Sequence, residues 1–348
     1  MRKLATIRTI SEIRPIPNAD AIETAIIDGW QVVIRKGEFK PGESAVYCEI
    51  DSWIPHAVAP FLSKGAEPRE YEGVKGERLR TIKLRGQISQ GLLLSLSVLG
   101  APPAEGFPDD VSGILGIKLW EPLIPACISG EARGLFPSIV AKTDQERIQN
   151  LITELPAWQG MVFEITEKLD GTSCTFYLDE STRDDDFHAC SRNFDIKRDE
   201  TNAFWNIATG HDLEARMKSL GLAGVAIQGE VIGPGIQSNK YKLPKPQFLV
   251  FDIYDTKQGR RLTRDERLPL VEKLGLAHVP TIHAAFALEN PIDQPAVCAG
   301  KLLELADGPS ALNPAQPREG IVFKAVENGN IHFKAISNKF LLKETLAT

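Results

Sequence analysis

Glu167-Lys-Leu-Asp-Gly-Thr-Ser173 is the stretch around which this chain of 348 residues is organised. A lysine amine attacks a phosphate only when its pKa is lowered, which nearby positive charge or desolvation achieves. Lys168 would then attack the α-phosphate of ATP and form a phosphoramide-linked adenylate. Asp170 shares a face with Lys168 in an extended chain and can bind a metal ion there, and Gly171 permits a tight turn beside the nucleotide. Alone, a Lys-x-Asp-Gly pattern is most often a surface turn, so the function depends on other segments.

Three predicted strands deliver polar residues that fit such a site. Residues 161–165 have a buried-strand pattern that leads into Lys168. Residues 187–190 precede Arg192, whose rigid fork suits a phosphate or a carboxylate, although a lone arginine is ordinarily a surface residue. Residues 225–230 form an apolar strand that ends in Glu230, a common position for a metal ligand.

Two further strands are predicted in the second half of the chain. In residues 247–254, a buried Asp252 needs a partner. Phe251 could stack on a base, a contact of about 1–3 kcal/mol, but core packing is commoner for a strand phenylalanine. After a turn and strand that carry Lys324, His332 and Lys334 alternate across Phe333, so both can point into one cleft. Lysines there would neutralise a triphosphate and help to lower the pKa of Lys168.

Helices are predicted from capping patterns. Thr143-Asp-Gln-Glu146 matches a capping box and predicts a helix that Pro156 ends. Its first half carries three polar side chains that could contact a base or a phosphate, although a solvated helix face is the favoured alternative; they are Arg147, Gln149 and Asn150. Residues 202–220 predict a second helix, and the capping box at Thr263 predicts a third that ends near Gly275.

The N-terminal hundred residues predict short strands. The runs 21–27, 30–34 and 44–50 are separated by turns at Asp28-Gly29 and Pro41-Gly42, which favours a small barrel or sandwich. The segment 75–90 is basic; its cations are Lys75, Arg78, Arg80, Lys83 and Arg85. Alternation of Arg78 and Arg80 predicts a strand with one basic face that follows a nucleic-acid backbone, and a solvated edge strand is the alternative.

Loops and composition limit the organisation further. Proline and glycine in 101–113 and 122–130 predict a boundary near residue 130, with domains 1–130 and 131–348. Asn239 and Lys240 lie in a polar loop that could contact a substrate strand. Hydrophobic residues at 43% and charged residues at 25% are ordinary for a soluble protein. The net charge of −6 does not indicate nucleic-acid binding by the chain as a whole, so local clusters of lysine and arginine matter more.

Two observations predict the compartment. No apolar run reaches the roughly 20 residues that span a bilayer, and the N-terminus lacks an apolar signal core. The five cysteines are an odd number without a CxxC pair. We therefore expect reduced thiols in a cytoplasmic protein that does not enter membranes, and neither disulfides nor a zinc site.

In order, the polar segments resemble the motifs of covalent nucleotidyltransferases, which include polynucleotide ligases and mRNA-capping enzymes. The matches are Lys168-Leu-Asp-Gly171, Ser191-Arg-Asn193, Gly229-Glu230, Phe251-Asp252, Glu319-Gly320 to Lys324, and Lys334. Over nearly the whole chain the sequence is more similar to ATP-dependent RNA ligases of the Deinococcus–Naegleria type. The segments that carry this similarity are 15–20, 79–91, 142–150 and 333–342.

The resemblance implies an α+β fold: an OB-type β-barrel followed by a nucleotidyltransferase (ATP-grasp-like ligase) domain of antiparallel sheets flanked by helices. It implies Lys168 as the nucleophile, and Asp170, Glu230 and Glu319 around a Mg²⁺ or Mn²⁺ ion, mostly through water. Phe251 would stack on adenine. The remaining expected ATP contacts are Arg192, Lys324 and Lys334 at phosphate, together with Glu167, Arg147, Gln149 and Asn150.

The implied reaction has three nucleotidyl transfers, each an in-line displacement assisted by a divalent cation. They give a lysyl-AMP, a 5′-adenylylated strand, and a sealed strand with release of AMP. The expected substrate is RNA with 3′-OH and 5′-phosphate ends, in nicked duplex, and we expect a monomer. A DNA ligase, a capping guanylyltransferase and a non-catalytic RNA-binding relative are the alternatives. The N-terminal position of the β module and the Lys334–Ser337 run argue against the first two, and the intact carboxylates against the third.

One position departs from the family pattern. The last motif is usually Lys-x-Lys, and here it is His332-Phe-Lys334. Histidine is largely neutral at pH 7. Either Lys334 and Lys324 suffice for phosphate binding, or formation of the lysyl-AMP is slower or more dependent on pH.

Overall fold

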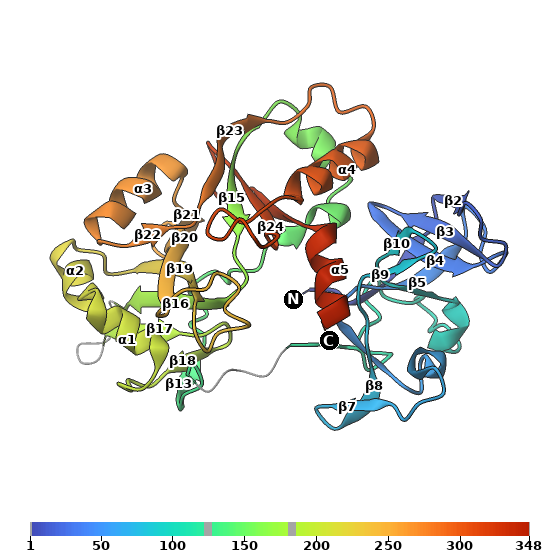
Figure 1. Ribbon diagram of the computed structural model, residues 1–348, viewed down its shortest axis with the longest axis horizontal. Coiled ribbons are helices and arrows are strands. Elements are labelled where there is room, and N and C mark those ends of the chain that lie inside the picture. The colour runs from blue at the N-terminus through green and yellow to red at the C-terminus, as the bar shows by residue number, and fades with distance from the viewer. Residues whose placement is uncertain (1, 122–126, 180–185, 348) are drawn as a thin grey trace. The chain divides into compact units, whose positions relative to one another are not determined.

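The computed structural model describes residues 2–121, 127–179 and 186–347, with side chains up to residue 344 (Figure 1). The chain divides into two compact units, one of Met1–Pro122 with Leu341–Thr348 and one of Leu123–Phe340. All five cysteines are free thiols, in agreement with the expectation of reduced cysteines. Within the described ranges, the helices are too short or too polar to cross a membrane.

The first unit is built from short strands. Its strands are β1 (Ala5–Thr9), β2 (Glu12–Pro15), β3 (Ile22–Ile27), β4 (Trp30–Arg35), β5 (Ser44–Cys48), β6 (Ser52–Pro55), β7 (Arg69–Tyr71), β8 (Val74–Arg78), β9 (Ile82–Leu84), β10 (Gln87–Ser89), β11 (Leu92–Leu94) and β12 (Lys118–Leu119), with 3₁₀ turns at Pro60–Ser63 and Leu96–Leu99. The hydrogen-bonded orders are β2-β3-β4, β1-β5-β11, β12-β6-β8-β7 and β10-β9. In the described part of the chain these sheets remain separate and do not close into one barrel.

The predicted β3–β4 hairpin shows how sequence fixes this unit. Ile27 pairs with Trp30, so Asp28-Gly29 forms a two-residue turn, and Asp28 has φ 50°. Asp-Gly suits such turns because both central positions favour positive φ. Along β4, Trp30, Val32 and Ile34 are buried, and the residues between them are more open. This alternation places one face of the hairpin in the core.

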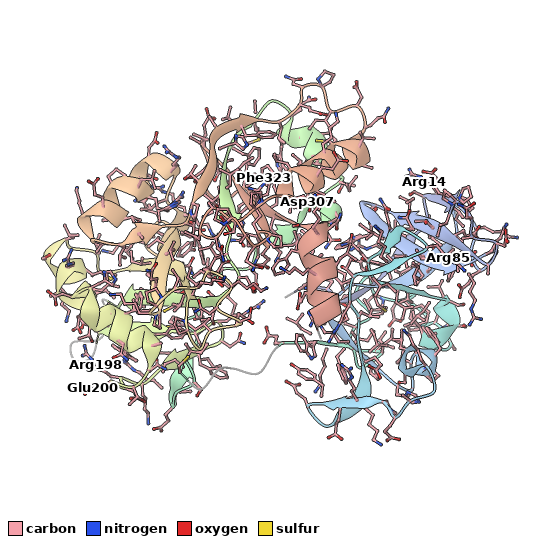
Figure 2. The ribbon with its side chains drawn as sticks, in the orientation of Figure 1. Arg14, Arg85, Arg198, Glu200, Asp307 and Phe323 are labelled. Atoms are coloured by element: carbon pink, nitrogen blue, oxygen red, sulfur yellow. The ribbon has the colours of Figure 1, made fainter. Side chains whose placement is uncertain are left out.

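The basic segment forms two elements rather than one. Strand β8 ends at Arg78, so the predicted strand with Arg78 and Arg80 on one face is wrong. The chain then bends back through β9 and β10, where Leu84 pairs with Gln87. Arg85 and Gly86 form the turn with φ 48° and 87°. Every residue of β9 is exposed, and so is Arg85 in the turn, which Figure 2 labels.

The second unit contains two sheets. Its strands are β13 (Ala132–Leu135), β14 (Glu146–Arg147), β15 (Val162–Lys168), β16 (Thr172–Leu178), β17 (Phe187–Cys190), β18 (Phe194–Ile196), β19 (Val225–Ile232), β20 (Gln247–Asp255), β21 (Arg260–Arg261), β22 (Ala277–His278), β23 (Thr281–Ala287), β24 (Gly320–Ala325) and β25 (His332–Ile336). One sheet has the order β13-β18-β17-β16-β19-β20-β21, with β22 beside β20, and the other has the order β14-β25-β24-β15-β23. The strands predicted at 161–165, 187–190, 225–230 and 247–254 are confirmed.

The helices of the second unit are α1 (Ala203–Gly210), α2 (Leu213–Ser219), α3 (Arg264–Lys273) and α4 (Pro295–Ala306). Helix α5 (Asn338–Ala347) begins in the second unit and ends in the first. Helices α1 and α2 contact β17 and β16, as Figure 1 shows, and α4 packs against β25. The single helix predicted over 202–220 is interrupted at Asp212, which has φ 51°. The predicted capping box at Thr263 is confirmed and begins α3.

The helix predicted from Thr143 is wrong. The segment instead forms β14 and 3₁₀ turns at Ile148–Asn150 and Leu155–Trp158. Strand β14 pairs in parallel with β25, and Ile148 is fully buried in the core. The Thr143 hydroxyl lies 3.1 Å from the Ser173 hydroxyl and does not cap a helix. Pairing with β25 and burial of Ile148 thus outweigh the helix-capping pattern of residues 143–146.

Candidate active site

One face of the β15–β24–β25 sheet is polar. In the strand register Glu164 lies opposite Lys324, and Lys324 lies opposite His332. Lys168 lies on the same face of β15, because side chains alternate along a strand, and Lys334 lies on the same face of β25. The other face carries the core phenylalanines Phe163, Phe323 and Phe333, which are fully buried. Figure 2 shows Phe323 inside its unit.

Lys168 lies among carboxylates at the end of β15. Its Nζ donates to Glu319 Oε1 at 2.6 Å, and its side chain is 24% exposed. The backbone N–H of Gly171 donates to Glu230 Oε1 at 3.1 Å. Asp170 forms an ion pair with Lys240, and its backbone N–H donates to the Tyr241 hydroxyl at 2.7 Å. The structure thus brings together the Lys-x-Asp-Gly motif, the Gly-Glu motif and Glu319.

These charges set the protonation of the site. Burial by itself would lower the pKa of Lys168, but the surrounding carboxylates, Glu319 foremost, raise it above its ordinary value. Burial raises the pKa of Glu230 to about 8, helped by Glu319 and opposed by Lys168. The expectation that neighbouring lysines lower the pKa of Lys168 is therefore wrong for the protein without nucleotide. Glu319, Glu230 and Asp170 each raise the pKa of Lys168, and together they outweigh the effect of burial.

The carboxylates fit a hard divalent cation held through water. Among the described residues, no group of three or more His, Cys, Asp or Glu side chains could hold a metal ion directly. Oxygen donors are nevertheless the ligands that Mg²⁺ prefers, and Mg²⁺ usually keeps several waters. The raised pKa of Glu230, caused first by burial and then by Glu319 and Asp170, marks an excess of negative charge that a cation would relieve.

Gly171 allows the motif to approach β19 closely. A Cβ at this position would lie 2.3 Å from the Val231 carbonyl oxygen and 2.6 Å from Ile232 Cγ2. Distances this short leave no space for a side chain. The glycine predicted for a tight turn is thus required by contact between β16 and β19, and this contact places Asp170 beside Glu230.

Phe251 and Asp252 lie at a β-bulge of β20, in the sheet that also contains β16 and β19. Gln228 pairs with Asp252 and Gly229 pairs with Val250, so Phe251 is the extra residue. Bulges change the direction of side chains and often occur next to active sites. The Phe251 ring is half-buried, and its centroid lies 5.8 Å from Lys324 Nζ, which also donates to the Phe251 carbonyl. The ring that was predicted to stack on a base is therefore partly exposed.

A buried charged cluster surrounds Asp252. Its Oδ2 lies 3.2 Å from Lys324 Nζ and 3.1 Å from Arg261 Nε. Burial lowers the pKa of Lys324 to about 8, against the opposing effect of Asp252. Burial and Arg261 lower the pKa of His332 to about 4, so His332 is neutral at pH 7. A dependence on pH between 6 and 8 is therefore not expected from His332.

Sequence reasoning missed Arg261, Tyr241 and Arg267. Arg261 lies on a two-residue strand that has the appearance of a surface turn in the sequence, and no pattern there indicates burial. Arg267 lies in α3, is 1% exposed, and pairs with Glu164 on the polar face. Alternation along β15 could have found Glu164, because it lies four residues before Lys168.

Four further predicted ATP contacts lie on or near β14 and after β17. Arg147 pairs with Lys334 in the parallel β14–β25 register, and Gln149 is buried. Asn150 Nδ2 donates to Glu146 Oε1 at 3.0 Å. Arg192 is exposed and forms an ion pair with Asp144 at 2.6 Å.

Glu167 differs from the other predicted contacts. Its side chain lies on the opposite face of β15 from Lys168 and accepts a hydrogen bond from the Ala311 N–H at 2.8 Å. Burial raises its pKa, and the Ser310 hydroxyl opposes that effect. The structure thus places this carboxylate away from the face that carries Lys168.

The residues predicted to contact nucleic acid have different surroundings. Asn239 closes its own loop through hydrogen bonds with Leu243, and Lys240 pairs with Asp170. Lys75 pairs with Glu67 at 2.6 Å on the surface. Lys83 and Arg85 are exposed on the β9–β10 hairpin.

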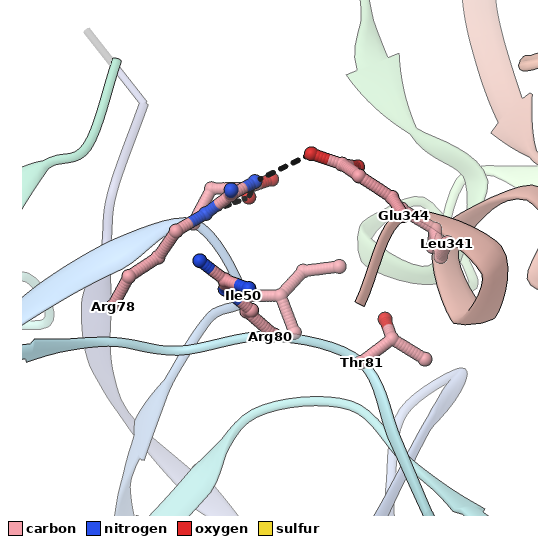
Figure 3. A pocket seen from close by; sticks show the side chains of 7 residues that line it. Ile50, Arg78, Arg80, Thr81, Leu341 and Glu344 are labelled. Carbon is pink, nitrogen blue, oxygen red and sulfur yellow. Dashed lines mark hydrogen bonds and ion pairs between the residues drawn. The ribbon is translucent and has the colours of Figure 1, made fainter. Parts of the chain in front are cut away.

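Arg78 and Arg80 line a small pocket of the first unit (Figure 3). Arg78 NH2 lies 2.6 Å from Asp51 Oδ1 and 3.2 Å from Glu344 Oε1, and its guanidinium lies 3.8 Å from the Trp120 ring centroid. The pocket also includes Thr81 and Leu341. Arg78 is therefore already paired and stacked within the first unit.

Comparison with known proteins gives consistent matches. The RNA ligase family model matches residues 161–337, and an OB-fold domain model matches residues 4–96. Among solved structures, a mutant Naegleria gruberi RNA ligase with ATP and Mn has 44% sequence identity and a TM-score of 0.88, over 97% of this chain and 98% of that chain. The Naegleria gruberi RNA ligase with pyrophosphate has 43% identity and a TM-score of 0.89, over 100% of both chains. A search of curated proteins found no match.

Proposed function

Since this chain belongs to the RNA ligase family, we propose that it joins RNA ends through a lysyl-AMP formed on Lys168. It is an ATP-dependent RNA ligase with an N-terminal OB-fold domain, so the predicted family, fold class and activity are confirmed. One observation supports Lys168 as the nucleophile. Lys168 is the last residue on the polar face of β15, its Nζ contacts Glu319, and Glu230 and Asp170 lie nearby.

In the first step the Lys168 amine attacks the α-phosphate of ATP. The Nζ–P bond forms, the P–O bond to pyrophosphate breaks, and the amine loses a proton. Because the carboxylates raise the pKa of Lys168, the amine is protonated before nucleotide binds. A bound Mg²⁺ or Mn²⁺ ion would supply positive charge that offsets both the carboxylates and the phosphates. Asp170, Glu230 and Glu319 would hold this ion mostly through water.

The polar face binds the rest of the nucleotide. Lys324 and Lys334 would contact phosphate from the floor of the face, and Arg192 would contact it from the loop after β17. Phe251 would stack on adenine, since its ring is half-buried beside Lys324. Arg147, Gln149, Asn150 and Glu167 remain proposed ATP contacts. The Glu167 side chain faces Ala311, so its backbone is the part that can reach the nucleotide.

The later steps transfer AMP to RNA. The 5′-phosphate attacks the lysyl-AMP, and Lys168 leaves. The 3′-OH then attacks the adenylylated 5′-phosphate, a phosphodiester bond forms, and AMP leaves. We propose a nick in duplex RNA as the substrate, held by Lys83 and Arg85 of the hairpin, with Lys75, Arg78, Arg80, Asn239 and Lys240 as further candidates. A monomer in the cytoplasm is proposed as well, and the free cysteines support that compartment.

The first experiment labels the protein with radioactive ATP and a divalent cation and resolves it on a denaturing gel. Wild type should retain label, and Lys168→Ala should not. Label from GTP in place of ATP would contradict the nucleotide assignment.

The second experiment compares sealing of RNA–RNA, RNA–DNA and DNA–DNA nicks and of single-stranded ends. We expect sealing where the 3′-OH strand is RNA and the junction is in duplex. Equal sealing of single-stranded ends would reject the nick as the substrate. Equal sealing by Lys168→Ala and wild type would reject Lys168 as the nucleophile.

A further inference from the structure

A buried carboxylate shared by two cations lies next to the proposed phosphate contacts. Asp252 is 2% exposed in its side chain, Lys324 is 3% exposed and Arg261 is 10% exposed. Both cations approach the same oxygen, Asp252 Oδ2, at 3.2 and 3.1 Å. Buried charges are costly unless they are paired, so the balance of these three groups matters for how Lys324 behaves.

Strand pairing and two hydrogen bonds hold Arg261 in this position. Arg261 pairs with Tyr254 in the β20–β21 ladder, and its NH2 donates to the Lys142 carbonyl at 2.9 Å. Its own N–H donates to Asn330 Oδ1 at 3.1 Å, in the turn before β25. The guanidinium is therefore fixed between the two sheets of the unit, within reach of Asp252 and beside His332.

The charge balance separates the roles of the two cations. If Asp252 had Lys324 as its sole partner, each charge would cancel the other, and the lysine would attract phosphate weakly. Arg261 compensates Asp252 instead. Because His332 is neutral, these four groups together retain one positive charge, and that charge is on Lys324, which lies on the same face of the sheet as Lys168.

We propose that Arg261 is a positioning residue for ATP: its guanidinium neutralises Asp252, so that the charge of Lys324 remains available to the nucleotide phosphates. This inference rests on the proposed function of the polar face. It assigns a role to a residue outside the motifs by which the family is recognised in this sequence. A merely structural role for Arg261 would predict loss of stability without a specific change in ATP dependence.

The test is a double-mutant cycle measured on formation of lysyl-AMP at varied ATP concentration. Arg261→Gln should lower the rate at limiting ATP on the order of tenfold, mostly through a higher apparent KM, because Asp252 then neutralises Lys324. Adding Asp252→Asn should remove most of that loss: Arg261→Gln should change the rate less than about threefold in the Asp252→Asn background. Arg261→Lys, which keeps a cation, should lie between wild type and Arg261→Gln.

Arg260→Gln is the matched control. Arg260 is the neighbouring residue on β21, and its guanidinium pairs with Glu266 on the surface. It should leave the apparent KM for ATP unchanged. Thermal unfolding of each variant separates misfolding from an effect on ATP.

Three results would overturn the inference. The first is an equal loss from Arg261→Gln with and without Asp252→Asn, the second is no loss at all, and the third is a loss in kcat with an unchanged KM. If Arg261→Gln does not fold, the comparison passes to Arg261→Lys in the two backgrounds. Absence of lysyl-AMP in wild type would instead reject the proposed function, so the two failures are distinguishable.

Discussion

At the scale of single residues, the surroundings of Lys168 control its chemistry, because the carboxylates around it raise its pKa. Lys168, Asp170, Glu230 and Glu319 follow from motif spacing, and the structure brings all four together. Their mutual effect on protonation depends on distances across strands, which spacing does not contain. Arg261 could not be found for the same reason, because its contacts are with the Lys142 carbonyl, far away in the sequence, and with Asp252 on another strand.

Gly171 gives the first prediction. Gly171→Ala should separate β16 from β19, because a Cβ would lie 2.3 Å from the Val231 carbonyl oxygen. We expect a loss of stability of about 1–3 kcal/mol, the usual effect of overpacking, and a loss of lysyl-AMP formation on the order of tenfold or more. Gly134→Ala is the control, since a Cβ there meets no atom within 4 Å. Wild-type activity of Gly171→Ala would show that this close contact is not needed.

Glu230 gives a prediction about pH. Burial raises its pKa from 4.5 to about 8, so its proton stabilises the folded state at low pH. That stabilisation should be lost as pH rises from 4.5 through about 8. Glu230→Gln can still accept the Gly171 N–H through its amide oxygen but cannot titrate. Thermal unfolding followed from pH 5 to pH 9, without metal, should therefore depend less on pH in Glu230→Gln than in wild type; an identical dependence would contradict the prediction.

At the scale of elements, local signals succeeded where packing agreed with them. Both capping boxes have the same pattern, but only Thr263 begins a helix. Around Thr143 the backbone is drawn into pairing with β25, and Ile148 enters the core. No local pattern contains that information. Strand predictions were more reliable, because runs such as 187–190 and 247–254 are apolar enough to be buried in any arrangement.

The β9–β10 hairpin gives a prediction at this scale. The double variant Lys83→Glu with Arg85→Glu should weaken RNA sealing on the order of tenfold, because it removes two cations that can contact phosphate. The lost contacts should also make RNA binding less dependent on salt. Formation of lysyl-AMP should stay unchanged. Lys36→Glu, an exposed cation at the turn after β4, is the control. If the hairpin variant seals RNA as fast as wild type across salt concentrations, the hairpin does not hold the substrate.

At the scale of the whole molecule, each unit has its own core, and the first unit is built from two separate segments of the chain. Leu341–Thr348 belongs to the same unit as Met1–Pro122. Leu341 is 9% exposed and lines a pocket with Ile50 and Thr81, and Glu344 pairs with Arg78 (Figure 3). Sequence patterns predicted two domains but did not predict this return of the chain.

Leu341 gives a prediction about the first unit. Leu341→Ala should destabilise that unit by about 2–3 kcal/mol, because it removes a mostly buried side chain. Amide hydrogen exchange should show faster exchange in β6 and β8, which carry or adjoin the pocket residues. Lys343→Ala, at an exposed position of the same helix, is the control. Unchanged exchange in Leu341→Ala would mean that this helix end adds no stability.

This return of the chain has a consequence for synthesis. A ribosome makes the first unit's strands before the second unit and its helical segment after the second unit, and domains generally fold as they emerge. The first unit therefore has to wait for the whole second unit before Leu341 and Glu344 can take their places. A nascent chain released before residues 341–344 would carry a first unit that lacks Leu341 and Glu344, so full assembly of the first unit has to follow synthesis of the second.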